Sequence, residues 1–166
     1  MEYLFRNLKA EEIDVRVAMC NEKGVTLLLY KDARVDQDIL DETVGPFNWQ
    51  RKHIRDNANC IVEIFDDVKK QWVQKEDTGT ESYTEKEKGL ASDSFKRACF
   101  NWGIGRELYT SPFIWIGADK CKIVKVKDRF TTYDKFNVEK IEITDKVITG
   151  LSIKNQNGQR VFVFKK

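Results

Sequence analysis

Two adjacent cations on a predicted helix are the residues of this chain whose types and spacing are best suited to chemistry. Lys96 and Arg97 fall on one side of a helix predicted over about residues 84–102, and Asp93 lies one turn before both. Arginine offers a planar fork to a phosphate and lysine a compact charge, and an aspartate at i−3 and i−4 can orient both. The pair therefore predicts contact with a phosphate chain, the alternative being two solvated charges on an outer helix face.

The helix that carries this pair has one apolar stripe, which predicts packing on a sheet. At about 100° per residue the stripe and its edges comprise Ala91, Phe95, Ala98, Trp102, Leu90 and Cys99. The opposite side collects Lys86, Asp93, Lys96, Arg97 and Phe100. Thr84 is the expected N-cap, Glu87 completes a capping box, and Gly103 ends the helix. Phe100 joins the core instead if the helical phase is shifted by one residue.

Further basic residues lie in or beside predicted strands, close to aromatic residues, as is usual for a groove that binds single-stranded nucleic acid. They are Arg16, Arg51, Lys52, Arg55, Lys69, Lys70 and Arg106. The net charge is +2, but residues 120–166 hold 12 basic and 5 acidic residues, whereas residues 1–119 hold 17 and 22. This asymmetry favours a polyanion partner, although a strand-rich tail with surplus solvated lysines gives the same count.

Enzymatic sites have little support in the sequence. The only histidine is His53, and the four cysteines lack metal-ligand spacing, so we expect buried thiols and no zinc site. A cysteine nucleophile would need His53 close in space. Glu63, Asp66 and Asp67 followed by Lys69 resemble a metal-nuclease pattern faintly, and a charged hairpin end is the simpler interpretation. No Walker-type glycine loop occurs, and we expect neither a cofactor nor a metal.

Alternation and helical periodicity predict an α+β chain. The expected elements up to residue 116 are a hairpin of strands 13–20 and 25–30, a helix 33–44 stopped by Gly45-Pro46, strands 47–54, 60–65 and 70–75, the helix 84–102 and a strand 113–116. The expected strands of the tail are 121–126, 129–136, 138–143, 147–154 and 160–165, with a turn at Asn157-Gly158. In a strand, residues 125, 127 and 129 share one face.

Composition and length agree with an ordinary globular chain. The 166 residues are 41% hydrophobic and 34% charged, and no stretch approaches the ~20 apolar residues that span a bilayer. The first residues lack the basic start and apolar run of a signal peptide. We therefore expect a cytoplasmic protein without a membrane partner.

Several segments resemble a known family. Residues 89–98 (Gly-Leu-Ala-Ser-Asp-Ser-Phe-Lys-Arg-Ala) and 102–109 (Trp-Gly-Ile-Gly-Arg-Glu-Leu-Tyr) resemble the signature helix of the Rad fifty-two/twenty-two family of single-strand annealing proteins. The similarity is closest to the short phage members, often called Sak-like. Upstream, Ile-Asp-Val-Arg at 13–16, Arg34-Val35, and Val-Gly-Pro-Phe-Asn-Trp at 44–49 follow in the family's order. The resemblance covers about residues 10–116.

The resemblance implies a fold for the first part of the chain, and the strand-rich, basic tail lies outside it. Residues 1–118 would form the annealing core: a β-hairpin, a short helix, a three-stranded antiparallel meander and a long helix packed on the sheet. From its charge and its expected strands, we expect residues 119–166 to form a small, basic, β-rich extension. We expect this extension to pack on the core and enlarge the basic surface for DNA, with an oligomer-stabilising or protein-docking appendage as the alternative.

The resemblance also implies a function and partners. The function is ATP-independent binding of single-stranded DNA and annealing of complementary strands in homologous recombination and DNA repair, in a phage or prophage and hence in the host cytoplasm. No catalytic residue is implied. The expected partners are single-stranded DNA, the annealed duplex and further copies of the chain in a ring or helical filament. A single-strand-binding protein is a further candidate partner.

Residues of the DNA site follow from the same resemblance. Lys96 and Arg97 correspond to the pair that grips the DNA backbone, and Arg16 to the arginine of the first strand. Phe100 stands where the family has another arginine, so Arg106 or a tail lysine would supply that charge. The other candidates for DNA contact are Tyr30, beside the family's aromatic position, Arg51, Lys52, and, for an outer site, Lys69 and Lys70.

Two other function classes stay open. A three-stranded meander flanked by two helices also resembles a double-stranded RNA-binding domain, which predicts a passive module for duplex RNA or DNA. A metal-dependent nuclease built on Glu63 and Asp66 is the weaker alternative.

Overall fold

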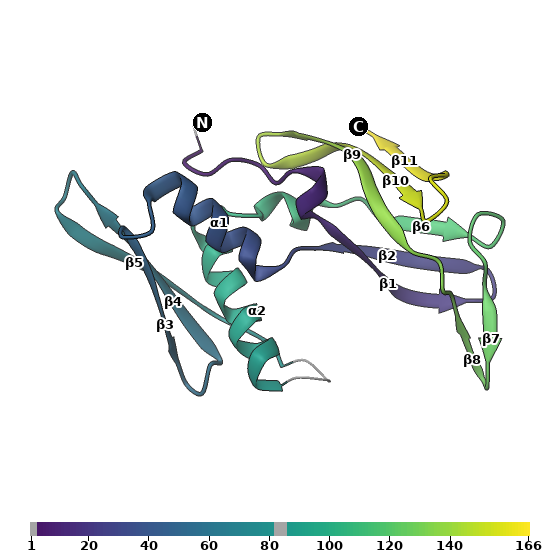
Figure 1. The fold of residues 1–166 in the computed structure, drawn as a ribbon, viewed down its shortest axis with the longest axis horizontal. Helices are drawn as coiled ribbons and strands as arrows, with labels where there is room; N and C mark the ends of the chain where they lie inside the picture. The colour runs from purple at the N-terminus through teal and green to yellow at the C-terminus, as the bar shows by residue number, and fades with distance from the viewer. Residues whose placement is uncertain (1–2, 82–85) are drawn as a thin grey trace. The chain divides into compact units, whose positions relative to one another are not determined.

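The computed structural model describes residues 3–81 and 86–166, which fall into two compact units (Figure 1). Unit 1 comprises Met1–Arg6 and Ala33–Gly105, and unit 2 comprises Asn7–Asp32 and Arg106–Lys166. Both units contain antiparallel strands, and two α-helices lie in unit 1. The expected α+β class is therefore confirmed.

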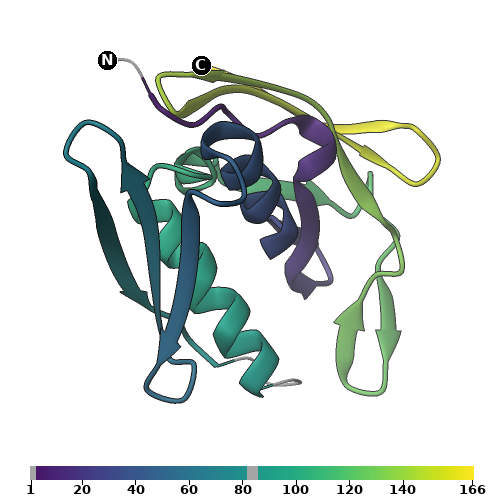
Figure 2. The same cartoon turned by 60° about the vertical axis from the view of Figure 1, so that its left-hand side comes forward.

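Unit 1 consists of two helices and a three-stranded antiparallel sheet (Figure 2). Its elements are α1 (Ala33–Val44), β3 (Trp49–Ile54), β4 (Asn59–Asp66), β5 (Gln71–Thr78) and α2 (Lys86–Asn101). The sheet order β3-β4-β5 is the expected meander. The helix α1 has the bounds that the sequence predicts, because Gly45 adopts a φ of +86° and donates its N–H to the Asp41 carbonyl at 3.0 Å.

The helix α2 covers one face of this sheet. Phe95, Ala98 and Cys99 are completely buried, and the Trp102 indole Nε1 donates to the Val62 carbonyl in β4 at 3.0 Å. The predicted apolar stripe is thus confirmed. The capping box proposed for Thr84 and Glu87 lies outside the residues and side chains that the structure describes.

Unit 2 is built on a six-stranded sheet. Its elements are η1 (Ala10–Glu12), β1 (Asp14–Asn21), β2 (Gly24–Tyr30), η2 (Arg106–Thr110), β6 (Ile114–Gly117), β7 (Val124–Val126), β8 (Arg129–Thr131), β9 (Phe136–Thr144), β10 (Val147–Asn155) and β11 (Arg160–Lys165). The strand order is β11-β10-β9-β1-β2-β6, and β7 and β8 form a separate two-stranded ribbon. The turn between β10 and β11 includes Gly158 with a φ of +76°, at the Asn-Gly position that the sequence indicates.

The C-terminal strands share a sheet with the N-terminal hairpin. Asp14 in β1 pairs with Asn137 in β9, and β9 pairs along its length with β10, in which Ile148, Leu151 and Ile153 are buried. This grouping differs from the expected division at residue 118. Its physical reason is that β1 pairs with β9 on one side of the hairpin and β2 pairs with β6 on the other, so one sheet joins the hairpin to both later segments.

The β7–β8 ribbon corrects one expectation about the tail. Lys125 pairs with Phe130 and Val126 with Arg129, so the chain reverses at Lys127 and Asp128. Lys127 has a φ of +58° in this turn. The prediction that residues 125, 127 and 129 share a face is therefore wrong. Lys125 and Arg129 lie on opposite faces of the ribbon, and Lys127 lies at its tip.

Within the part of the chain that the structure describes, no helix is both long and apolar enough to cross a membrane.

Candidate nucleic-acid interface

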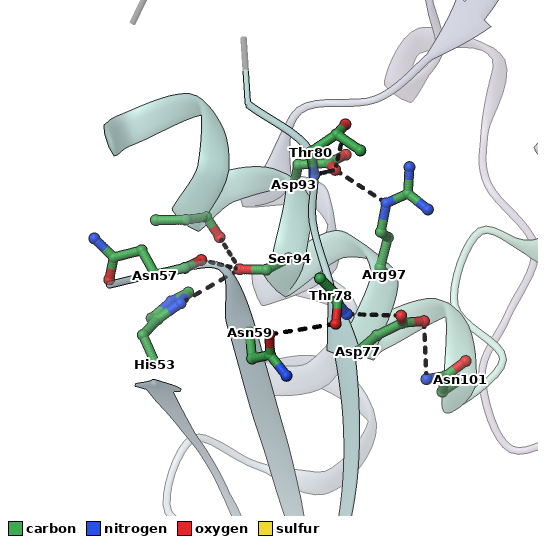
Figure 3. Close-up of polar contacts among 11 residues, drawn as sticks. His53, Asn57, Asn59, Asp77, Thr78, Thr80, Asp93, Ser94, Arg97 and Asn101 are labelled. Carbon is green, nitrogen blue, oxygen red and sulfur yellow. Dashed lines mark hydrogen bonds and ion pairs between the residues drawn. The ribbon is translucent and has the colours of Figure 1, made fainter. Parts of the chain in front are cut away.

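The side chain of Arg97 is held in place by Asp93. The Asp93 Oδ2 accepts hydrogen bonds from Arg97 Nε at 3.0 Å and from the backbone N–H and the hydroxyl of Thr80 at 2.7 and 3.2 Å. Figure 3 shows that the two terminal nitrogens of the guanidinium lie on the far side of Nε from Asp93. The i,i+4 pair expected from the sequence is confirmed, and the fork of Arg97 is directed away from its anchor.

The charge of Asp93 is secured by its hydrogen bonds. Burial by itself raises the pKa of the Asp93 carboxyl, but the hydrogen bonds from Thr80 and Arg97 outweigh burial, so the net pKa is lowered. The carboxylate is therefore ionised at neutral pH. An ionised Asp93 keeps Arg97 in one position, which reduces the rotamer entropy that Arg97 loses when it binds a phosphate.

Lys96 and Phe100 also lie on α2, and both are half-buried. Phe95 and Ala98, by contrast, are fully enclosed between α2 and the sheet. Phe100 is therefore not part of the fully buried stripe.

Two cations of the sheet lie over aromatic rings. In the cross-strand register, Arg51 and Lys75 flank Val62 on the side of the sheet that α2 covers. The Arg51 guanidinium carbon lies 4.5 Å from the Phe95 ring centroid, and the Lys75 ammonium lies 4.8 Å from the Trp102 centroid. The Lys75 ammonium also donates to a backbone carbonyl of α2 at 3.2 Å. These contacts place a cation on each outer strand beside α2.

Two of the predicted site residues, Arg51 and Lys52, are neighbours in β3 and therefore point to opposite faces of the sheet. Arg51 lies on the α2 side of the sheet, whereas Lys52 pairs with Ile61 on the opposite face. Lys52 therefore does not join the cations that surround α2.

The lysines proposed for an outer DNA site lie in the β4–β5 turn beside carboxylates. In two i,i+3 pairs, Lys69 is 4.0 Å from the half-buried Asp66, and Lys70 is 3.8 Å from the exposed Asp67. Asp66 also accepts the backbone N–H groups of Val68 and Lys69, at 2.9 and 3.2 Å. The turn thus carries no net charge, and its first carboxylate stabilises the turn.

Three predicted site residues lie in unit 2. The Arg16 guanidinium carbon lies 5.7 Å from the ring centroid of Tyr30, so the structure brings these two together in the β1–β2 hairpin. Both side chains are exposed. Arg106 is exposed at the first position of η2. Lys96, Arg97, Phe100, Arg51, Lys52, Lys69 and Lys70 belong to unit 1.

The histidine of the chain contacts a buried serine. The Ser94 hydroxyl lies 2.9 Å from the Asn57 carbonyl, 3.2 Å from the Ala91 carbonyl and 3.4 Å from His53 Nδ1 (Figure 3). Burial, and then the charge of Arg51, lower the pKa of His53. Through these contacts the completely buried Ser94 fixes the β3–β4 turn to α2.

The carboxylates of the nuclease pattern do not converge. Glu63 hydrogen-bonds to Gln50 on the face of the sheet opposite α2, and Asp66, three positions along β4, lies on the other side of the strand. Among residues 3–81 and 86–166, no three His, Cys, Asp or Glu side chains are grouped to hold a metal ion. The pattern is therefore explained by sheet and turn formation.

The cysteines are predominantly buried thiols, as the sequence predicts. Cys60, Cys99 and Cys121 are buried, Cys20 is half-buried, and none of the four forms a disulfide. Burial raises the pKa of Cys60 to about 11, so its thiolate is rare at neutral pH.

Lys75 is a further candidate, which we did not predict from the sequence. Lys75 could have been found from the two-residue period of a strand, because Val73, Lys75 and Asp77 in β5 all lie on the α2 side of the sheet. Asp77 Oδ2 accepts a hydrogen bond from the Asn101 amide at 3.1 Å, so polar side chains line this boundary between β5 and α2.

Comparisons of the chain with protein-family models, curated proteins and solved structures found no match.

Proposed function

We propose that this protein binds single-stranded DNA and anneals complementary strands without a nucleotide cofactor. The observation that carries the proposal is the Lys96-Arg97 pair on the side of α2 away from the sheet, with Arg97 fixed by Asp93. A fixed guanidinium fork beside a lysine matches a phosphate chain in both charge and geometry. The likeness of residues 89–98 to the annealing family's signature helix supports the same assignment.

Cations paired with aromatic rings add to this support. Arg51 lies over Phe95 and Lys75 over Trp102 in unit 1, and Arg16 lies over Tyr30 in unit 2. Proteins that bind single strands combine backbone-tracking cations with aromatic side chains. We propose that the two pairs of unit 1 line a basic groove beside α2, and that Arg16 with Tyr30 is a separate contact for the strand in unit 2.

The mechanism of annealing follows from backbone neutralisation. Cations that neutralise the phosphates of one strand lower its repulsion for a second strand. When the bases are held outward, a complement is tested by base pairing, and the product is stabilised by its own pairing and stacking. Several copies of the chain in a ring or filament align many nucleotides at once and multiply weak contacts into tight binding.

The proposal is tested by removing the helix pair. Lys96→Ala with Arg97→Ala should weaken single-stranded DNA binding and slow annealing of complementary oligonucleotides, and each lost phosphate contact should reduce the salt slope by roughly 0.7. Lys69→Ala with Lys70→Ala is the matched control, because these lysines in the same unit are paired with Asp66 and Asp67. Unchanged affinity and slope in a folded helix variant would remove the pair from the groove.

A passive duplex-binding module is the second candidate. The order α1-β3-β4-β5-α2 of unit 1 is the order expected for a double-stranded RNA-binding domain. Such a domain covers about 16 base pairs and needs a broad positive surface. Residues 1–6 and 33–105, however, hold 12 basic against 15 acidic residues. A higher affinity of this protein for duplex RNA than for single-stranded DNA, lost in the Lys96/Arg97 variant, would favour the module.

A further inference from the structure

The most basic segment of the chain is a two-stranded ribbon. Residues 120–129 contain five basic residues and one acidic residue. Residues 124–129 of this segment form β7, the turn and the start of β8. Figures 1 and 2 both show the ribbon extending away from the six-stranded sheet of unit 2.

The cations of this ribbon point in three directions. Lys125 lies on one face beside Phe130, Arg129 lies on the other face beside Val126, and Lys127 occupies the tip. All three cations are exposed. Within residues 3–81 and 86–166, none of the three forms an ion pair. Their charge is therefore available to an external polyanion on both faces at once.

The base of the ribbon is fastened to the rest of unit 2. Asp134 accepts the backbone N–H of Lys122 at 2.9 Å and the side-chain amide of Gln156 at 2.9 Å. Cys121 Sγ lies 3.3 Å from the Thr132 hydroxyl, which joins the two legs of the ribbon. These contacts fix the segment before β7 and the segment after β8, so the position of the ribbon on unit 2 is defined.

We propose that the β7–β8 ribbon is a binding element for B-form duplex DNA that enters the major groove. The major groove is about 12 Å wide and admits a two-stranded β-ribbon. A ribbon with cations on both faces can contact the phosphates on both sides of that groove. The major groove of A-form RNA is deep and narrow, which excludes the same insertion.

This inference extends the proposed function, because duplex DNA is the product of annealing. The helix pair and the ribbon then have different partners, a single strand for Lys96 and Arg97 and the finished duplex for the ribbon. A protein that retains the duplex keeps newly paired strands in place while pairing spreads.

The test compares two triple variants with the same change in charge. The ribbon variant is Lys125→Gln, Lys127→Asn and Arg129→Gln, in which Asn suits the positive φ at position 127. The control variant replaces three exposed lysines elsewhere in unit 2, namely Lys23→Gln, Lys140→Gln and Lys165→Gln. Fluorescence anisotropy measures binding of a blunt 20-mer DNA duplex, a dT-only strand and an RNA duplex over a range of salt, and thermal unfolding checks the fold.

We expect the ribbon variant to lose about tenfold or more in duplex DNA affinity, with a salt slope smaller by roughly 0.9 per lost phosphate contact. Its affinity for the dT strand stays unchanged, and the control variant loses much less duplex affinity. Equal losses in the two variants, equal losses for duplex and single strand, or equal sensitivity of the RNA duplex would each overturn the inference.

Failure of the inference can be distinguished from failure of the proposed function. If the wild-type protein binds the dT strand and anneals but does not bind the duplex, the ribbon proposal is wrong and annealing stands. If it binds the duplex through the ribbon but neither binds single strands nor anneals, the proposed function is wrong and the ribbon assignment stands.

Discussion

Asp93 and Arg97 form an i,i+4 pair 3.0 Å apart, and the same carboxylate oxygen also holds the backbone N–H of Thr80. One carboxylate therefore ties together the segment after β5, the middle of α2 and the cation proposed to bind DNA. Asp93 is a positioning residue in this arrangement, since it acts on the DNA only through Arg97.

The positioning role predicts a coupling between Asp93 and Arg97 in DNA binding. In an Asp93→Asn background, Arg97→Ala should weaken single-stranded DNA binding less than it does in the wild type, because the guanidinium is no longer held. A double-mutant cycle should give a coupling free energy of about 0.5 kcal/mol or more. The cycle of Asp67→Asn with Lys70→Ala, an exposed pair at 3.8 Å, should give a value near zero. Equal coupling in the two cycles would contradict the role of Asp93.

We expect the protein to form a homo-oligomer. In unit 2, Met19, Tyr109 and Phe113 are 69%, 69% and 76% exposed beside a pocket of about 560 Å³. Large exposed apolar side chains gathered at one place are typical of an interface. Light scattering should give a mass several times 19.4 kDa. Phe113→Glu should lower it, whereas Phe47→Glu, at an exposed position in unit 1, should not. A monomeric wild-type mass with and without DNA would refute this expectation.

A shortened chain that ends at Ala118 should lose the structure of unit 2. It lacks β9, β10 and β11, half of the six strands of the sheet. It also lacks Lys146, whose ammonium lies 3.8 Å from the fully buried Glu107 carboxylate. Hydrogen exchange should show rapid exchange in β1 and β2 and retained protection in β4. Protection of β1 and β2 equal to that in the full chain would show that the C-terminal strands are a separate extension.

Stability at acid pH should depend on Glu139. Its carboxylate receives two hydrogen bonds from Arg160, at 2.7 and 2.8 Å, and lies 3.2 Å from Lys154. The hydrogen bonds from Arg160 contribute most to lowering the pKa of Glu139 from 4.5 to about 2. Because the folded pKa is depressed, the stabilisation is complete above pH 4.5 and is lost as the pH falls towards 2. Between pH 4.5 and 2, the midpoint of urea unfolding should change less with pH in Glu139→Gln than in the wild type. Glu142→Gln, at an exposed site on the same strand, should show the pH dependence of the wild type.

Local signals account for the elements that the sequence predicts correctly. Gly45-Pro46 ends α1 where expected, and the 3.6-residue periodicity identifies the stripe of α2 that includes Phe95 and Ala98. The Asp93–Arg97 pair follows from helical spacing alone. These features depend on residues close together in the chain.

The features that the sequence does not reveal depend on residues far apart in the chain or on a turn that contains no glycine. The pairing of Asp14 with Asn137 joins strands from the two ends of the chain, and alternation within a strand does not identify its neighbour. The expected strands 121–126 and 129–136 leave a break at Lys127 and Asp128, but no glycine there indicates that the chain reverses into a ribbon. The direction of the ribbon cations follows from that reversal, so it could not be predicted.

The division of the chain between the units has a consequence for its biosynthesis. Unit 1 interrupts unit 2, because residues 33–105 lie between β2 and η2. At 5–20 residues per second, a ribosome makes β9 on the order of 5–20 s after β2. The helices and the meander of unit 1 are local and can fold during synthesis, whereas the β1–β2 hairpin waits with Val25 and Leu27 uncovered. The six-stranded sheet is therefore completed only after β9, β10 and β11 have been made, and until then the nascent hairpin is the segment most in need of a chaperone.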